Sequence, residues 1–186
     1  MSRLDAQRLV IADDPRLANV VRIRQAARKV RQRNGCLDLI VIDYLQLMQG
    51  EGGNRNEELA GITRALKLLA REIGCPIILL SPLSREVEKR TDKRPLMSDL
   101  RESGAIEQDA DVILMAYRED CYIPESPFKG MAEILIRKQR MGPLGGGFLT
   151  FQGKYLRFLN VDLQELVRAK NSAVAQPKAK YSQLRD

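Results

Sequence analysis

Residues 39–44 of the chain read Leu-Ile-Val-Ile-Asp-Tyr. Four consecutive branched apolar residues that end in a carboxylate are typical of a strand buried on both faces of a parallel sheet. Similar short apolar runs occur at residues 9–11, 76–80 and 111–115. In chain order, helical patterns separate the runs at residues 9–11, 39–42 and 76–80. Strands that alternate with helices predict a doubly wound α/β core with a mainly parallel sheet.

The two helical segments have recognisable ends. Asp14, which precedes a proline, suits the start of the first helix, and Gly35 suits its end. In the second segment, apolar residues repeat at helical spacing between a cap at Asn54 or Asn56 and a stop at Gly74. Both helices therefore connect consecutive strands of the predicted core.

The last third of the chain has antiparallel strand signals. Short alternating segments and a glycine-rich turn occur at residues 133–138, 142–147, 148–152 and 155–159. They predict a hairpin or meander at one edge of the sheet. A short helix is expected at residues 163–169. Residues 170–186 are polar and basic, so we expect one domain over residues 1–169 followed by a disordered tail.

Composition narrows the possible chemistry. Lys and Arg number 31 against 24 for Asp and Glu, and this net charge of +7 favours a polyanionic partner. The chain has no histidine, which excludes a Ser-His-Asp triad and an ordinary zinc site. Carboxylates, Lys and Arg remain, and these serve phosphoryl transfer. The sequence shows no secretory signal or membrane span, and its three cysteines have no C-x-x-C pair. We therefore expect a cytoplasmic protein with reduced thiols.

Asp43 is the first candidate site residue, because it ends the strand at residues 39–42. Ligands of open α/β sheets bind at the carboxyl ends of the strands. An aspartate there can hold a Mg²⁺ ion that bridges nucleotide phosphates. The alternative is an aspartate that caps the following turn.

A charged segment at residues 80–96 is expected to leave the fold as an exposed loop. It leads to Arg101, Glu102, Ser103 and Gly104. A serine cap and a small glycine would let backbone N–H groups and Arg101 approach a phosphate. A solvated loop with an ordinary helix cap is the alternative.

Lys138 and Arg140 follow the first strand of the hairpin. Alternation places both on one face of the strand, with Gln139 on the other. An ammonium and a guanidinium presented together suit the charge that develops on a transferring phosphoryl group. Edge-strand charges that discourage aggregation are the alternative.

Taken together and in order, four segments closely resemble the RecA-like motor domain of DnaB-type replicative helicases. They are LIVIDYLQLM at residues 39–48, the helix at 56–74, LMSDLRESGAIEQDA at 96–110 and IRKQRMGPLGGGFLTF at 136–151. The resemblance extends over residues 9–160. Within it, DLRESG and KQR are more specific than the strand that ends in aspartate.

The resemblance implies roles for the candidate residues. Asp43 matches the Walker B aspartate that holds Mg²⁺ beside ATP. Lys138 and Arg140 match the pair that reaches into the nucleotide site of the neighbouring subunit in a homohexameric ring.

Two loops match those that line the DNA channel in this family. One runs through Gly50 and Arg55. The other, with Arg101, Glu102 and Gly104, follows the backbone of single-stranded DNA.

The implied activity is ATP-driven 5′ to 3′ translocation on single-stranded DNA and unwinding of duplex DNA in replication. Primase and a helicase loader are the implied partners.

Two departures from the family qualify this interpretation. No G-x-x-x-x-G-K-[ST] motif occurs in the 186 residues, and Pro82 stands where the family usually has a glutamine that contacts the terminal phosphate. We therefore expect a partial RecA-like motor, without the N-terminal strands and phosphate-binding loop, that is inactive by itself. A non-catalytic module that binds single-stranded DNA or docks on a helicase ring is the alternative. A recombinase or another ATPase of the RecA-like fold fits the DLRESG and KQR motifs less well.

Overall fold

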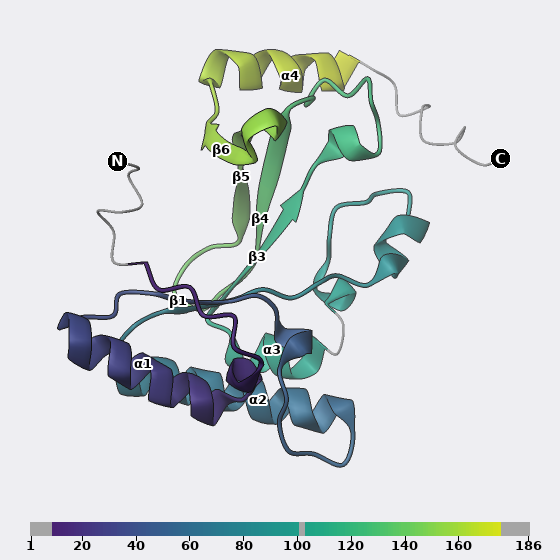
Figure 1. Cartoon of the computed structure of the whole chain (residues 1–186). Helices are drawn as coiled ribbons and strands as arrows, with labels where there is room; N and C mark the ends of the chain where they lie inside the picture. Colours follow the sequence, from purple (N-terminus) through teal and green to yellow (C-terminus); the bar gives the residue numbers. More distant parts are fainter. Residues whose placement is uncertain (1–8, 101–102, 176–186) are drawn as a thin grey trace. The chain divides into compact units, whose positions relative to one another are not determined.

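The computed structural model describes residues 9–100 and 103–175, which divide into two compact units (Figure 1). The first unit comprises Met1–Pro82 and Leu100–Ala110, and the second comprises Leu83–Asp99 and Asp111–Asp186. Of the candidate residues, Arg101 and Glu102 lie outside the described residues.

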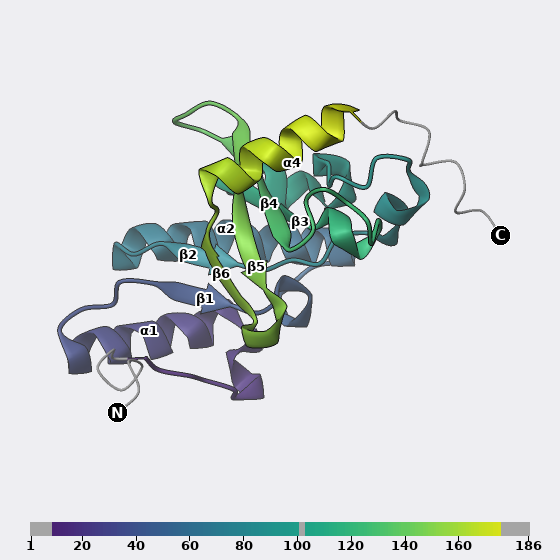
Figure 2. The ribbon, with the colours of Figure 1, turned by 90° about the horizontal axis from the view of Figure 1, so that it is seen from above.

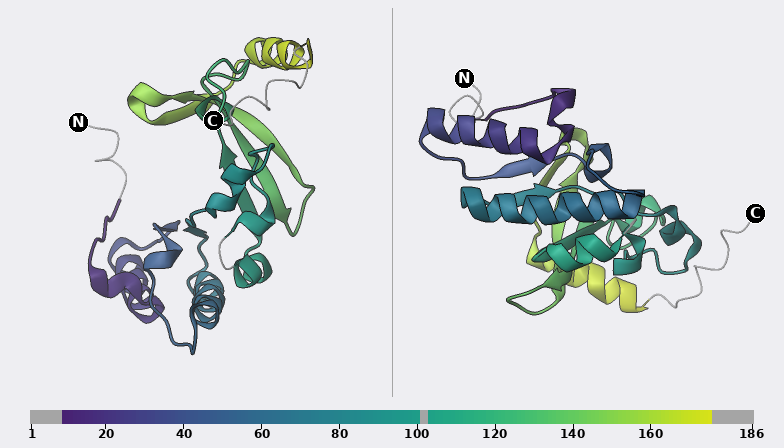
Figure 3. Two further views of the ribbon diagram at one scale, coloured as in Figure 1. Left: turned by 90° about the vertical axis from the view of Figure 1, so that its right-hand side faces the viewer. Right: turned by 90° about the horizontal axis from the view of Figure 1, so that it is seen from below.

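Two helices of the first unit lie on the same side of a two-stranded parallel sheet (Figure 3). The strands are β1 (Ile40–Ile42) and β2 (Ile77–Leu79), and Ile40 pairs with Ile77. The helices are α1 (Val20–Asn34) and α2 (Arg55–Ile73). One stripe of α2 contributes to the core of this unit through the buried residues Leu59, Ile62, Leu66, Leu69 and Ile73. This stripe follows the helical period that the sequence predicts.

The caps define the helix ends. Asn54 accepts a hydrogen bond from the backbone N–H of Glu57, which settles the open choice of N-cap, and Gly74 ends α2 in the left-handed conformation. Asp14 caps only a 3-10 turn, η1 (Pro15–Ala18), and α1 begins after a second cap at Asn19. The first predicted helix is therefore divided in two by competing caps.

A four-stranded antiparallel sheet forms the second unit (Figure 2). Its strands are paired in chain order: β3 (Val112–Tyr117), β4 (Met131–Gln139), β5 (Gly145–Gln152) and β6 (Arg157–Asn160). This sheet confirms the predicted meander. Helix α4 (Leu163–Ala175) follows it and continues six residues past the end expected at residue 169.

The mainly parallel sheet predicted from the sequence is found only in part among the described residues: β1 and β2 pair in parallel, whereas β3 to β6 are antiparallel. Residues 9–11 form no strand and are exposed, and β3 pairs with β4 in the antiparallel sheet. Residues 118–130 contain one short 3-10 turn, η5 (Glu119–Cys121), and no crossover helix, so β4 returns antiparallel to β3. The parallel pair is also half exposed, since the register partners Val41 and Ile78 face away from the core.

The charged segment after β2 is more ordered than an exposed loop. It forms two 3-10 turns, η3 (Arg85–Lys89) and η4 (Met97–Asp99). Val87 and Asp99 are buried, and Arg94 hydrogen-bonds Glu133 of β4. The segment therefore packs on the antiparallel sheet of the second unit. Among the described helices, none has the length and apolar character needed to cross a bilayer.

Candidate functional site

Asp43 lies directly after β1, at the carboxyl end of the parallel pair. The chain is fixed there by two backbone hydrogen bonds to β2 and its extension: Leu80 N–H donates to Ile42 O at 3.0 Å, and Leu45 N–H donates to Leu80 O at 2.9 Å. The Asp43 side chain is exposed. The structure thus presents a carboxylate at the edge where α/β sheets bind ligands.

The Asp43 carboxylate is of the kind that contributes to a magnesium–nucleotide site. Within the part of the chain that the structure describes, no group of three or more His, Cys, Asp or Glu residues is arranged to hold a metal ion. Mg²⁺ in nucleotide sites commonly takes one or two carboxylates, with phosphate and water oxygens completing its shell. Asp43 is suited to supply one such carboxylate.

Pro82 follows β2 at the same edge, and its ring is exposed. Its neighbour Ser81 accepts a hydrogen bond from the Gln46 amide at 3.2 Å. Proline has neither a side-chain amide nor a backbone N–H, so position 82 offers no donor to a phosphate.

The loop before α2 is held in place by Arg55. Its guanidinium donates to the carbonyl oxygens of Gln46 at 2.9 Å and Met48 at 3.1 Å, and it forms a 2.5 Å ion pair with Glu58. Glu58 in turn accepts from Gly50 N–H at 2.7 Å, and this bond, then that from Arg55, lowers the pKa of the Glu58 carboxyl. Arg55 is therefore an anchor of the predicted channel loop.

Glycine allows the same loop to approach the first turn of α2. A Cβ on Gly52 would lie 2.6 Å from the backbone nitrogen of Glu58, which is closer than van der Waals contact allows. Glu57 holds the other end of the loop, because its carboxylate accepts from Gly53 N–H at 3.0 Å and from the Asn54 side chain at 2.9 Å. The loop thus has a defined shape.

Gly104 lies near the start of α3 (Ser103–Asp109), exposed and with open space where a Cβ would be. Helix α3 packs on α2, and the buried Thr63 hydroxyl donates to Asp109 at 2.6 Å. This bond fixes the helix that carries one residue of the predicted DNA loop.

Lys138 and Arg140 lie at the end of β4 in the second unit. Lys138 is half-buried and pairs in register with Ile113 of β3. Arg140 is exposed in the following turn; its backbone N–H donates to Asp111 O at 3.0 Å, and its guanidinium lies 3.6 Å from the Asp111 carboxylate. The strand end thus presents two cations a short distance apart along the chain.

Sequence reasoning missed two further arginines of the second unit. Arg94 and Arg137 join residues 92–99 to β4. A weak signal exists for each, since Arg94 precedes a proline inside a charged segment and Arg137 directly precedes Lys138. Neither pattern indicates which residue each arginine contacts.

With this geometry in place, comparisons with known proteins identify the family. Residues 1–160 match the family described as DnaB-like helicase C-terminal domain. The chain belongs to this family. This confirms the resemblance inferred from the sequence.

Two relatives of this DnaB-like chain are half identical to it. The replicative DNA helicase DnaB of Pasteurella multocida is 50% identical over 158 residues, which are 84% of this chain and 34% of the relative. That of Geobacillus stearothermophilus is 50% identical over 156 residues, which are 82% of this chain and 34% of the relative. The chain thus spans about a third of the length of these relatives.

A solved structure agrees with this assignment. It is that of a DnaB-like replicative helicase, described with its interactions with primase, and it matches with a TM-score of 0.74 and 44% identity. The match covers 77% of this chain and 35% of the solved chain. A second solved structure, of an ATPase domain, matches with the same score and identity over 77% of this chain and 52% of its own. The matched residues therefore share the α/β fold of the corresponding part of DnaB-like ATPase domains.

Proposed function

We propose that this chain is part of the motor of an ATP-dependent replicative DNA helicase that translocates 5′ to 3′ along single-stranded DNA. The observation that carries the proposal is the exposed Asp43 carboxylate at the carboxyl end of β1, in a chain of the DnaB-like family. Parallel sheets of this class bind nucleotides at that edge.

Asp43 would hold the Mg²⁺ ion of a bound nucleotide. Mg²⁺ in such a site neutralises charge on the phosphate oxygens during transfer. Lys138 and Arg140 would act at the nucleotide of a neighbouring subunit, where two cations stabilise charge that develops on the phosphoryl group. Hydrolysis would then require a homo-oligomeric ring, a homohexamer as the family resemblance implies.

The DNA contacts would come from the first unit. The anchored loop at residues 48–54 and the start of α3 are candidates for following a phosphate backbone, together with Arg101 and Glu102, which lie outside the described residues. The net charge of +7 supports a contact that depends on salt and not on base sequence. Primase and a helicase loader would be partners of the complete helicase.

A second candidate is a non-catalytic module that binds single-stranded DNA or docks on a helicase ring. Pro82 favours it, because this position lies at the nucleotide edge of the sheet without a donor. The two candidates differ in whether Asp43 and Arg140 take part in turnover.

A mixing experiment separates the two candidates. The 186 residues contain no G-x-x-x-x-G-K-[ST] motif, so the assay uses the chain joined to the preceding residues of the G. stearothermophilus helicase. Arg140→Ala should leave ATP binding nearly intact and lower DNA-stimulated hydrolysis by about a thousandfold, the scale of a lost arginine finger. Mixing it with Asp43→Ala subunits should restore part of the activity, because an interface with a normal Asp43 and a normal Arg140 can form.

Two results would contradict the helicase proposal. The first is unchanged hydrolysis and unwinding in Arg140→Ala. The second is a lack of any recovery in mixed rings whose assembly has been verified by native mass spectrometry. Single-stranded DNA binding without any turnover in the unmodified joined protein would favour the non-catalytic module.

A further inference from the structure

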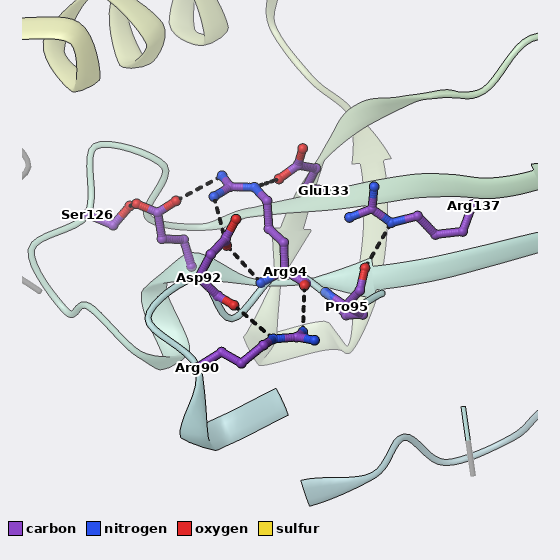
Figure 4. Close-up of polar contacts among 8 residues, drawn as sticks. Arg90, Asp92, Arg94, Pro95, Ser126, Glu133 and Arg137 are labelled. Atoms are coloured by element: carbon purple, nitrogen blue, oxygen red, sulfur yellow. Dashed lines mark hydrogen bonds and ion pairs between the residues drawn. The ribbon is translucent and has the colours of Figure 1, made fainter. Parts of the chain in front are cut away.

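Residues 92–99 of the second unit are tied to the antiparallel sheet by Arg94 (Figure 4). The Arg94 guanidinium donates to Glu133 of β4 at 2.8 Å and to Glu119 of η5 at 3.2 Å. Its central carbon lies 4.9 Å from the ring centroid of Tyr117 on β3. One side chain thus contacts three elements of the sheet unit.

This cluster is largely shielded from water. The side chains of Glu119 and Glu133 are 10% and 17% exposed, and that of Arg94 is 30% exposed. Burial by itself lowers the pKa of Arg94, but the hydrogen bond to Glu133 and the nearby carboxylates outweigh it and raise that pKa. The guanidinium therefore stays charged, as a charge-assisted pair requires.

Residues 92–99 are also held by Arg90, which lies just before them in the chain. Arg90 forms a two-pronged pair with the buried Asp99, at 3.0 and 2.6 Å, and donates to the Arg94 carbonyl oxygen at 3.0 Å. Asp99 accepts in addition from Leu96 N–H at 2.7 Å. A bidentate guanidinium–carboxylate pair fixes the relative orientation of the two side chains as well as their distance. These bonds therefore give residues 92–99 a defined shape.

Arg137 joins this segment to β4 at an irregular point of the strand. Ile113 of β3 pairs with Lys138 and Leu114 pairs with Ile136, so Arg137 is the extra residue of a β-bulge. Its Nε donates to the Pro95 carbonyl oxygen at 2.8 Å (Figure 4). Bulges change the direction of the side chains that follow them, and here Lys138 follows immediately.

We infer that Arg137, supported by Arg94, is a positioning residue: its bond to Pro95 fixes the bulge and so sets the orientation of Lys138 and Arg140. The role in turnover rests on the function proposed above. The structural part does not rest on it, because the position of Arg140 can be followed without turnover. Its backbone N–H donates to Asp111 O, and exchange of this amide proton reports whether that bond is kept.

Substitutions at Arg137 can separate the hydrogen bond from the charge. Arg137→Gln places an amide N–H at the same number of bonds from the backbone as the arginine Nε, whereas Arg137→Leu has no donor. Arg118→Leu is a matched control: Arg118 pairs with Asp120 at 3.1 Å and stacks on Phe151 at 4.2 Å in the same unit.

Amide hydrogen exchange of the 186-residue chain, measured by NMR, tests the structural part. Arg137→Leu should speed exchange of the Arg140 and Asp99 amides by roughly tenfold or more, the effect of losing a charge-assisted hydrogen bond. Leu135 within β4 should be unchanged. Arg137→Gln and Arg118→Leu should match the parent chain. Unchanged Arg140 exchange in Arg137→Leu, or equal acceleration in Arg137→Gln, would overturn the inference.

If Arg137→Leu also exposes Leu135, the strand has unfolded and Arg94→Lys is measured in its place. The lysine ammonium lacks the guanidinium fork, so the Asp99 and Arg140 amides should exchange faster than in Arg118→Leu; no difference would overturn the inference.

In the joined protein, Arg137→Leu should lower kcat for ATP about tenfold, in line with the exchange effect, with KM unchanged, and Arg137→Gln should restore it. A parent protein without turnover refutes the proposed function, while the exchange data still decide the positioning role.

Discussion

Replacing Thr63 with valine tests whether one buried hydrogen bond holds α3 on α2. The substitution keeps the shape of the side chain and removes the hydroxyl that donates to Asp109 at 2.6 Å. Thr63 is 5% exposed, so the lost bond lies in a nearly dry environment. Hydrogen bonds to charged groups contribute about 1.5–3 kcal/mol. Asp109 is half-buried and can regain water, which places the expected loss at about 1–2 kcal/mol.

A loss of this size should open α3 locally. A change of 1.4 kcal/mol is about tenfold in an equilibrium constant, so the Ala110 amide, which donates to Ile106 O, should exchange roughly five to thirty times faster. Hydrogen exchange followed by NMR measures this directly, and Thr150→Val on β5 serves as a control. A change of less than twofold in the exchange rate of the Ala110 amide would show that this hydrogen bond does not hold α3 on α2.

The close approach of Gly52 to α2 and the hydrogen bond between Gly50 and Glu58 can be tested in the same way. Gly52→Ala should destabilise the chain by roughly 1–3 kcal/mol in urea unfolding followed by circular dichroism, because its Cβ would meet the Glu58 backbone; Gly104→Ala, in open space on a helix, should stabilise it slightly. The lowered pKa of Glu58 means that its bond to Gly50 persists above the ordinary glutamate pKa and is lost as pH falls through the lowered value. The Gly50 amide shift should report this titration, and Arg55→Ala should move it to higher pH. A midpoint that Arg55→Ala leaves unchanged would show that Arg55 does not hold this carboxylate.

Local signals in the sequence were sufficient for most of the helices and for the meander. Gly35 and Gly74 end α1 and α2 as predicted, because a left-handed residue after a helix suits glycine. The start of α1 was missed because Asp14 and Asn19 both carry capping side chains, and only the second begins an α-helix. Capping strength alone does not decide between two such residues.

Which strands pair with each other depends on tertiary packing, which the pattern of apolar residues in the sequence does not indicate. The run at residues 112–115 is as apolar as the strand before Asp43, yet in β3 Ile113 and Met115 are buried while Leu114 is 60% exposed. A continuous apolar run and a one-sided strand therefore look alike in sequence when the exposed face is also apolar.

The candidate site shows the same division between local and distant information. The position of Asp43 after β1 followed from the strand pattern alone, and the structure places it there. Arg94 and Glu133, which are in contact, are separated by 39 positions in the sequence, and Arg137 and Pro95 are separated by 42. Such pairs arise only once the chain folds, so no local motif could indicate them.

In the proposed helicase motor, the Asp43 carboxylate takes part in binding and turnover of magnesium–ATP. Asp38 is a matched control, because it is an exposed aspartate that precedes the same strand. The measurement is Mg²⁺-dependent ATP hydrolysis, with single-stranded DNA present, in the chain joined to the preceding residues of the G. stearothermophilus helicase. We predict that Asp43→Asn lowers turnover by at least about a hundredfold, as expected when a metal-binding carboxylate is lost, while Asp38→Asn stays within about twofold of the parent. Equal turnover in Asp43→Asn and Asp38→Asn would contradict the assignment.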